Sequence, residues 1–352
     1  MEKMVWWEQV RILGITNKET SGLHLCWSAS GIAFVTAASV VTVEMAAQSI
    51  APQEDAFIGV FINDEKQFRQ KIRAVPGKRK YIIYQQEAAE TVRIRLVKLT
   101  EEQYGNVWIT NLITDAPVTR DAIPSRHLLF IGDSLTAGYG VDGINGISAF
   151  RTADEDVTKT YAYQAAEMLH ADSRIVAYSG NGVLSRWIAP EQDTPYTKNI
   201  LPEIFPYIQN EVPDLIVCNL GTNDASYVRQ IPSRERAFVE KYTDFIQQLK
   251  KVFADAKMLL LYGLMEQTLC EKVQETAQRC GTEFLKLPLQ NPVNGMGTDG
   301  HPGARTQQEI ALYVERYMEQ MMMWRTDVQV YWLICFRWLS FQKCLTDMVQ
   351  LK

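Results

Sequence analysis

The segment at residues 128–140 constrains the fold most strongly, because a short apolar run is followed there by a turn of small residues. Residues 128–131 are Leu, Leu, Phe and Ile, which is typical of a buried strand, and Gly132 permits a sharp exit from it. Ser134 would then begin a helix, where its backbone N–H and the helix dipole favour a negative charge beside its hydroxyl. This arrangement suits acyl transfer by a serine nucleophile, although simple connections and phosphate-binding turns share the pattern.

A serine nucleophile needs a base, and His301 is the best candidate in the chain. The other three histidines have structural explanations. His24 lies in an expected strand, His127 precedes the apolar run, and His170 lies at the end of a helical pattern. His301 lies in a Gly- and Pro-containing loop, residues 297–303, before a helical pattern at 306–323. Asp299, two residues upstream, is predicted to orient it, although a surface turn would have a similar composition.

Two further apolar segments, residues 215–220 and 175–178, also end in small or polar residues. The first leads to Asn223, whose side-chain amide can donate to an oxyanion, although capping of the next helix is a commoner role for Asn. The second leads to Gly180, which can present a bare backbone N–H. Because parallel strands end at one edge of a sheet, the three turns and the His301 loop predict a single site there.

These residues resemble the SGNH (GDSL) hydrolase superfamily over roughly residues 126–323. Its four sequence blocks correspond to Gly132-Asp133-Ser134, Gly180, Gly221-Thr222-Asn223-Asp224 and Asp299-Gly300-His301-Pro302. The resemblance implies that Ser134 is the nucleophile and His301 the base. It also implies an oxyanion hole made of the Ser134 N–H, the Gly180 N–H and the Asn223 amide.

One departure from the superfamily pattern points to a narrower family. Most members place the acid three residues before the histidine, where this chain has Thr298, and its acid, Asp299, comes one residue later. The chain thus resembles carbohydrate esterase family 2, in which the acid, where present, lies two residues before the histidine. Some members work with a Ser-His dyad supported by a backbone carbonyl, so the resemblance is compatible with a triad or a dyad. Softer likenesses lie in residues 10–14, 27–34 and 97–101.

The chain divides into an all-β part and an α/β part. Short apolar stretches separated by polar, Gly or Pro residues predict a β-sandwich or jelly roll over residues 1–122. These stretches are residues 23–27, 32–35, 40–45, 56–62, 81–84, 92–97 and 107–112. Strands then alternate with helical patterns such as 161–169 and 235–253, which predicts an α/β domain with a parallel sheet over residues 123–323. By resemblance, this is a flavodoxin-like, three-layer SGNH domain.

Composition excludes several other classes of protein. A net charge of -5 does not supply the basic field of a nucleic-acid-binding protein, and Lys78-Arg79-Lys80 is interpreted as a solvated turn. The six cysteines lack metal-ligand spacing, so we expect reduced thiols, no metal and no cofactor. The first residues lack the apolar core of a signal peptide, which predicts a cytoplasmic protein.

Residues 324–352 are expected to form a largely helical C-terminal tail. The apolar segment at 330–336 is too short to span a bilayer and is followed at once by Arg337, so we expect no integral membrane segment. We expect the tail to pack on the domain or on another copy of the chain, which would give a homo-oligomer. Contact with a membrane surface and a non-native extension are the alternatives.

The resemblance implies a carbohydrate O-acetyl esterase, a serine carboxylic ester hydrolase that removes acetyl groups from acetylated xylo- or manno-oligosaccharides of hemicellulose. Trp187 is a candidate platform for a sugar ring, and Tyr139 and Tyr227 follow the expected catalytic turns, although ordinary packing explains such aromatics equally well. Asp133 is expected to organise the turn of Ser134. The alternatives are an SGNH lipid or thioester hydrolase and a carbohydrate-binding protein with a silent site.

Overall fold

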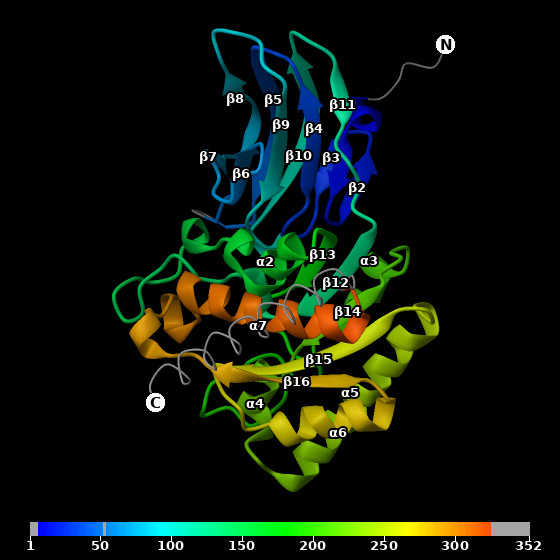
Figure 1. The fold of residues 1–352 in the computed structure, drawn as a ribbon. Helices are drawn as coiled ribbons and strands as arrows, with labels where there is room; N and C mark the ends of the chain where they lie inside the picture. Colours follow the sequence, from blue (N-terminus) through cyan, green and yellow to red (C-terminus); the bar gives the residue numbers. More distant parts are fainter. Residues whose placement is uncertain (1–5, 52–53, 325–352) are drawn as a thin grey trace, which may run out of the picture.

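The computed structural model describes residues 6–51 and 54–324. Figure 1 shows a lobe of strands at the amino-terminal end of the chain and a second lobe in which helices surround a sheet. The chain passes from one lobe to the other between β11 (Val118–Arg120) and β12 (Arg126–Gly132). The predicted domain boundary, between residues 122 and 123, falls in this connection.

The first domain is a sandwich of two antiparallel sheets within the described residues. One sheet has β11 paired to β4 and the order β1 (Arg11–Leu13), β4 (Gly31–Thr36), β9 (Val92–Lys98), β6 (Ala56–Ile62) and β7 (Gln70–Ala74). The other sheet has the order β2 (Thr16–Glu19), β3 (Gly22–Leu25), β10 (Gly105–Thr114), β5 (Val40–Ser49) and β8 (Gly77–Gln85). Alternate residues of β5, such as Val41 and Val43, are buried in the core that the sheets share, because side chains of a strand alternate between its faces.

The sandwich confirms the all-β prediction, whereas jelly-roll connectivity stays a prediction. The apolar pattern did not predict β1, β2, β7 and β11. These strands are short, and most residues of β2 and β7 are polar. The prediction of a turn at Lys78-Arg79-Lys80 is wrong, because these residues lie in β8 and pair with β5. They are exposed on an edge strand, and Lys78 binds Glu44 at 2.6 Å. Lysines are common on such edges, where they discourage pairing with other chains.

A parallel sheet forms the centre of the second domain. Its strand order is β13 (Ala171–Ala177), β12, β14 (Leu215–Asn219), β15 (Lys257–Leu264) and β16 (Glu283–Leu289), which is the expected flavodoxin-like order. The helices are α1 (Ser134–Ala137), α2 (Tyr161–Met168), α3 (Phe205–Ile208), α4 (Thr222–Val228), α5 (Pro232–Val252), α6 (Cys270–Cys280) and α7 (Ala304–Met322). The short 3-10 helices are η1 (Trp6–Gln9), η2 (Glu102–Tyr104), η3 (Thr152–Asp154), η4 (Val157–Lys159), η5 (Leu201–Ile204), η6 (Pro292–Asn294) and η7 (Thr298–Gly300).

Helices cover both faces of this sheet. Phe130 of β12 belongs to a buried cluster with Tyr161 of α2 and Val314 of α7. The next residue, Ile131, belongs to a second cluster with Phe245 of α5. Because successive side chains of a strand point to opposite faces, a strand that is covered on both sides needs a continuous apolar run. No helix in the described part of the chain is long and apolar enough to cross a bilayer.

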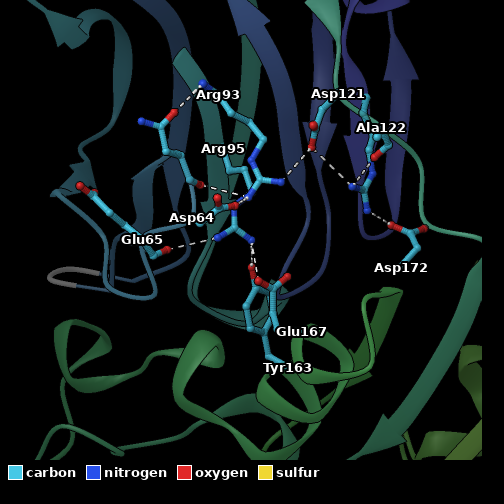
Figure 2. Close-up of polar contacts among 11 residues, drawn as sticks. Asp64, Glu65, Arg93, Arg95, Asp121, Ala122, Tyr163, Glu167 and Asp172 are labelled. Atoms are coloured by element: carbon cyan, nitrogen blue, oxygen red, sulfur yellow. Dashed lines mark hydrogen bonds and ion pairs between the residues drawn. The ribbon is translucent and has the colours of Figure 1, made fainter. Parts of the chain in front are cut away.

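Arginines of the sandwich bind acidic residues of the α/β domain, as Figure 2 shows at the domain boundary. Arg95 of β9 is nearly buried and donates to Glu167 Oε2 at 2.9 Å and to the Tyr163 hydroxyl at 3.4 Å, both on α2. Arg11 of β1 donates to Asp172 Oδ1 of β13 at 2.6 Å. The two domains therefore contact each other directly, beyond the chain that joins them.

Trp324 is the last residue that the structure describes. Its ring lies 5.0 Å from the Arg126 guanidinium, which also donates to the Trp324 carbonyl at 3.2 Å. The rest of the predicted helical tail, and the oligomer predicted through it, lie outside the described residues.

Replacing Arg95 with Met is expected to weaken the domain contact, because Met keeps the aliphatic stem and loses the charged donors. We expect the free energy of unfolding to fall by about 2 kcal/mol, the magnitude of hydrogen bonds to charged groups. Urea denaturation followed by circular dichroism measures this loss. Arg69→Met is the matched control, because its ion pair with Glu65 is exposed and worth less than about 1 kcal/mol. Equal losses in the two variants would contradict a stabilising contact at Arg95.

Candidate active site

Ser134 and His301 meet at the carboxyl edge of the parallel sheet, although they are far apart in the sequence. Ser134 is the first residue of α1, just after β12, and His301 lies between η7 and α7. The Nε2 of His301 is 2.9 Å from the Oγ of Ser134. A hydroxyl and an imidazole within hydrogen-bond distance form the pair that a serine nucleophile and its base require.

The turn before Ser134 is fixed by Gly132 and Asp133. A Cβ at Gly132 would lie only 2.1 Å from Thr136 Oγ1, so a side chain does not fit there. Asp133 caps α1, since its Oδ1 accepts from the Leu135 N–H at 3.0 Å. Burial raises the pKa of Asp133 to about 7. These contacts agree with the interpretation that Asp133 organises the turn.

The second ring nitrogen of His301 faces a backbone carbonyl. Its Nδ1 lies 3.0 Å from the Thr298 oxygen. A carbonyl oxygen can only accept, so Nδ1 carries the proton and Nε2 turns its lone pair toward the Ser134 hydroxyl. Burial lowers the pKa of His301 below its ordinary value of 6.5, which keeps the imidazole neutral and able to accept a proton.

The structure corrects the prediction that Asp299 orients His301. The Thr298 carbonyl takes that place, and the Asp299 carboxylate instead accepts a hydrogen bond from the Tyr139 hydroxyl at 3.0 Å. Asp299 is exposed and has a left-handed backbone with φ of 52°. Of the two forms compatible with the sequence, the structure has the dyad supported by a backbone carbonyl.

Tyr139, a predicted substrate-binding residue, lies beside the imidazole. Its ring centroid is 4.6 Å from that of His301, and on the Phe150 ring it stacks with a centroid distance of 3.9 Å. Tyr139 therefore forms a wall of the site, and its contact with a substrate stays a prediction. Phe150 was missed because it lies in an irregular loop whose residue types carry no periodic pattern.

The other two predicted turns reach the same edge through the register of the sheet. Gly132, the last residue of β12, pairs with Ala177 of β13 and with Asn219 of β14. Gly180 and Asn223 therefore follow strands that end at one level. Gly180 has φ of 80°, a conformation that favours glycine. Their roles as oxyanion donors stay predictions.

The Asn223 amide connects the turns to one another. Its Nδ2 donates to the Asn181 carbonyl at 2.8 Å and lies 3.3 Å from Asp133 Oδ2. Gly221 occupies the N-cap position of α4, so Asn223 lies inside the helix and is not its cap. The alternative that Asn223 serves as a helix cap is therefore excluded.

Asp224 holds the loop that follows Gly180. Its buried carboxylate accepts three backbone N–H bonds at 3.0, 2.7 and 2.9 Å, from Val183, Leu184 and Ser185. Burial raises the pKa of Asp224 to about 6. In the sequence, Asp224 stands out only as the last residue of Gly221-Thr222-Asn223-Asp224, and its position beside Asn223 is the one signal for this role.

Trp187, another predicted substrate-binding residue, lines a hollow of about 510 Å³. Trp187 is 57% exposed, and its backbone N–H donates to the Gly180 carbonyl at 2.8 Å, which ties it to the same turn. The other lining residues are Ile188, Tyr196 and residues 192–195. An exposed aromatic ring in a concave surface can stack on a ligand.

Tyr227, the third predicted substrate-binding residue, is held by protein contacts. The guanidinium of Arg234 lies 4.5 Å from its ring centroid, and Arg234 also donates to its carbonyl at 2.8 Å. The half-buried ring packs on the apolar cluster of the sheet face that α5 covers. These contacts favour the packing interpretation for Tyr227.

Metal ligands do not gather in the part of the chain that the structure describes: no group of three or more His, Cys, Asp or Glu side chains could hold an ion there. The described cysteines are free thiols: Cys26, Cys218, Cys270 and Cys280. Among the other histidines, His24 stacks on Trp108 at 4.6 Å on the sandwich, in agreement with its structural interpretation.

Comparisons with known proteins match both domains. Residues 130–320 match the GDSL-like lipase/acylhydrolase family, and residues 14–119 match the carbohydrate esterase 2 N-terminal family. Cellulase/esterase CelE of Acetivibrio thermocellus is 29% identical over 203 residues, 53% of this chain and 24% of that protein, so the chain spans about a quarter of this relative. An acetylxylan esterase / glucomannan deacetylase of Cellvibrio japonicus is 28% identical over 270 residues, 70% of this chain and 73% of that protein.

Solved structures share the two-domain fold. A carbohydrate esterase family 2 enzyme of Corynascus thermopiles matches with a TM-score of 0.78 and 25% identity, over 90% of this chain and 100% of that chain. An acetyl xylan esterase of the rumen bacterium Butyrivibrio proteoclasticus matches with a TM-score of 0.82 and 22% identity, over 90% of this chain and 97% of that chain. These likenesses confirm the predicted fold class.

Asp299→Asn is expected to slow the labelling of Ser134 by a fluorophosphonate less than about tenfold, because the Thr298 carbonyl orients His301. Loss of the orienting aspartate in a Ser-His-Asp triad costs about 10⁴-fold. His301→Ala, which removes the base, is the comparison and should slow labelling far more. Mass spectrometry of the intact protein measures the rates. If the two variants slow the labelling of Ser134 by the same factor, Asp299 belongs to a catalytic triad after all.

The labelling rate is expected to decline on acidification with a midpoint below pH 6.5, the ordinary pKa of a histidine. Only the neutral imidazole accepts the Ser134 proton, and because burial lowers the His301 pKa, the neutral form persists to lower pH. The Asp299 carboxylate raises the His301 pKa, so Asp299→Asn should move the midpoint further down. A midpoint above 6.5 in the parent would show that burial does not dominate.

Proposed function

The chain belongs to the GDSL-like lipase/acylhydrolase family, and we propose that it is a carbohydrate O-acetyl esterase resembling carbohydrate esterase family 2. The observation that carries the proposal is the 2.9 Å contact between Ser134 Oγ and His301 Nε2, in a domain that follows a family 2 type of β domain. The name of the Cellvibrio japonicus relative, an acetylxylan esterase and glucomannan deacetylase, supports a sugar ester as the substrate.

Acylation begins when His301 Nε2 takes the proton of Ser134 as its Oγ attacks the acetyl carbonyl carbon. The carbonyl oxygen becomes an oxyanion that the Ser134 N–H, the Gly180 N–H and the Asn223 amide stabilise. Collapse of this intermediate breaks the bond between the carbonyl carbon and the sugar oxygen. His301 gives its proton to that oxygen, so the sugar leaves with a free hydroxyl and Ser134 keeps the acetyl group.

Deacylation repeats these steps with water. His301 takes a proton from water as the water oxygen attacks the acetyl carbon on Ser134, and an oxyanion forms in the same place. When the intermediate collapses, the bond to Ser134 Oγ breaks and His301 returns its proton to that oxygen. Acetic acid leaves, loses its remaining proton to the solvent to become acetate, and the enzyme is restored. Loss of one oxyanion donor should raise the barrier by about 3 kcal/mol.

The hollow lined by Trp187, whose backbone N–H is bonded to the Gly180 carbonyl, is the proposed place for the sugar chain of an acetylated xylo- or manno-oligosaccharide. Trp187 and Tyr196 supply aromatic surfaces there, and a volume of about 510 Å³ is within the range of small-ligand sites. The Arg186 guanidinium lies 5.3 Å from the Tyr178 ring and 5.4 Å from the Tyr196 ring, which brings N–H donors to this region. Stacking surfaces next to charged donors suit a polyhydroxylated ligand.

A long acyl chain fits this hollow less well than a sugar chain does. The hollow is lined in part by Gln192, Asp193 and Thr194, whose polar groups would lose water on contact with an alkyl chain. This lining favours the sugar ester over the lipid or thioester substrate of the alternative interpretation.

Acetate release from acetylated xylo- and manno-oligosaccharides tests the proposal. The parent protein should release acetate, and Ser134→Ala should lower the rate by at least about 10⁴-fold, because the nucleophile is gone. Long-chain 4-nitrophenyl esters should react more slowly than 4-nitrophenyl acetate. Proton NMR measures the acetate and identifies the hydroxyl that is freed.

Ser21→Ala is the matched control, since Ser21 is an exposed residue of the sandwich and contacts Glu19. It should leave acetate release unchanged. Acetate release by Ser134→Ala at the parent rate would contradict the proposal, and so would a parent protein that cleaves only long-chain esters.

A further inference from the structure

A carboxylate of the sandwich domain is bound to the turn that carries Gly180. Glu101 lies between β9 and η2 and is fully buried. Its Oε2 accepts from the Ser179 N–H at 2.6 Å, and its Oε1 accepts from the Ser179 hydroxyl. Gln103 donates to the same carboxylate at 2.8 Å. Both oxygens of one carboxylate are thus engaged by the residue immediately before Gly180.

Glu101 is itself held firmly by neighbours on both sides of the domain boundary. Its N–H donates to Glu155 Oε1 at 2.8 Å, from the segment between η3 and η4 of the α/β domain. Its carbonyl accepts from Lys98 Nζ at 3.1 Å, and Lys98 also donates to the Cys26 carbonyl at 3.1 Å. Lys98 and Glu155 are both fully buried. The carboxylate therefore reaches Ser179 from a backbone that has little freedom to shift.

The contact matters because the Gly180 N–H belongs to the peptide unit that joins Ser179 to Gly180. On the other side of Ser179, the Tyr178 N–H donates to the Gly132 carbonyl at 3.1 Å, which anchors the turn to the end of β12. Beyond Gly180, the Asn181 carbonyl accepts from the Asn223 amide at 2.8 Å. Of the bonds along this turn, those of Glu101 come from the other domain.

We propose that Glu101 is a positioning residue: it holds Ser179 at its backbone N–H and its hydroxyl, and this fixes the following peptide so that the Gly180 N–H meets the oxyanion. The inference rests on the esterase function proposed above. It makes the sandwich domain part of the catalytic apparatus, because the oxyanion hole of one domain is aligned by a side chain of the other. Glu101 acts through Ser179 and does not touch the substrate.

Two substitutions of Glu101 distinguish the effect of side-chain length from the effect of the negative charge. Glu101→Gln keeps the length of the side chain, and its amide oxygen still accepts from the Ser179 N–H. Glu101→Asp keeps the carboxylate but shortens the side chain by one methylene, so it no longer reaches Ser179 from the fixed backbone. Positioning by geometry predicts that Asp is the more damaging change, whereas a need for charge alone predicts the reverse.

Steady-state hydrolysis of 4-nitrophenyl acetate by the full chain measures the effect. We expect Glu101→Asp to lower kcat at least about tenfold with KM changed less than about twofold, because the loss is in the transition state. Glu101→Gln should retain most of the parent kcat. Glu167→Ala is the control, since it removes the contact with Arg95 at the same domain boundary and should leave kcat unchanged. Melting temperatures of all variants separate unfolding from loss of alignment.

The outcomes distinguish this inference from the proposed function. A parent that hydrolyses no acetyl ester refutes the function, and the inference falls with it. An active parent with Glu101→Asp at the parent kcat, or with Glu101→Gln more damaged than Glu101→Asp, refutes the inference alone. If Glu101→Asp fails to fold, Ser179→Ala decides, because it keeps Glu101 and removes one of the two contacts. An unchanged kcat in Ser179→Ala together with an impaired Glu101→Gln then overturns positioning.

Discussion

The common end level of three parallel strands is the constraint on which the site depends. Gly132 at the end of β12 pairs with Ala177 of β13 and with Asn219 of β14, and the turns with Ser134 and Gly180 begin at that level. A slip of one residue in this pairing would turn every side chain of a strand to the opposite face. The burial of apolar side chains against helices on both faces therefore fixes the level of the turns, in addition to stabilising the sheet.

The main chain orients the base of the site without adding a charge. The Thr298 carbonyl accepts from His301 Nδ1, which fixes the tautomer, and burial keeps the imidazole neutral. A carboxylate in that place would also stabilise the imidazolium that forms when Ser134 loses its proton. Asp299 is exposed and accepts a hydrogen bond from Tyr139, so its charge acts on the His301 imidazole without a direct hydrogen bond between the two side chains. In the proposed reaction, the predicted oxyanion donors would then supply a larger share of the stabilisation of the transition state.

The sequence predicted the parts of the molecule that local pattern or chemical necessity determines. Residues 128–131 form a doubly covered strand because such a strand needs a continuous apolar run, and His301 could be found because a serine nucleophile needs a base. The role of Asp299 could not be predicted, since its left-handed backbone is not encoded by the residue types around it. Glu101 and Ser179 are 78 positions apart, and their contact depends on how the domains pack, which no local pattern describes.

The shared core explains why such a contact between domains can be exact enough to serve an active site. Leu13, Phe61 and Val97 of the sandwich belong to the same buried cluster as Ala166 of α2. A domain boundary that is apolar and closely packed restricts relative motion, whereas polar boundaries allow it. The turn of Ser179 lies at this boundary, so any movement of the sandwich would move the turn relative to Ser134. A fixed oxyanion site therefore requires the rigid boundary that the shared core provides.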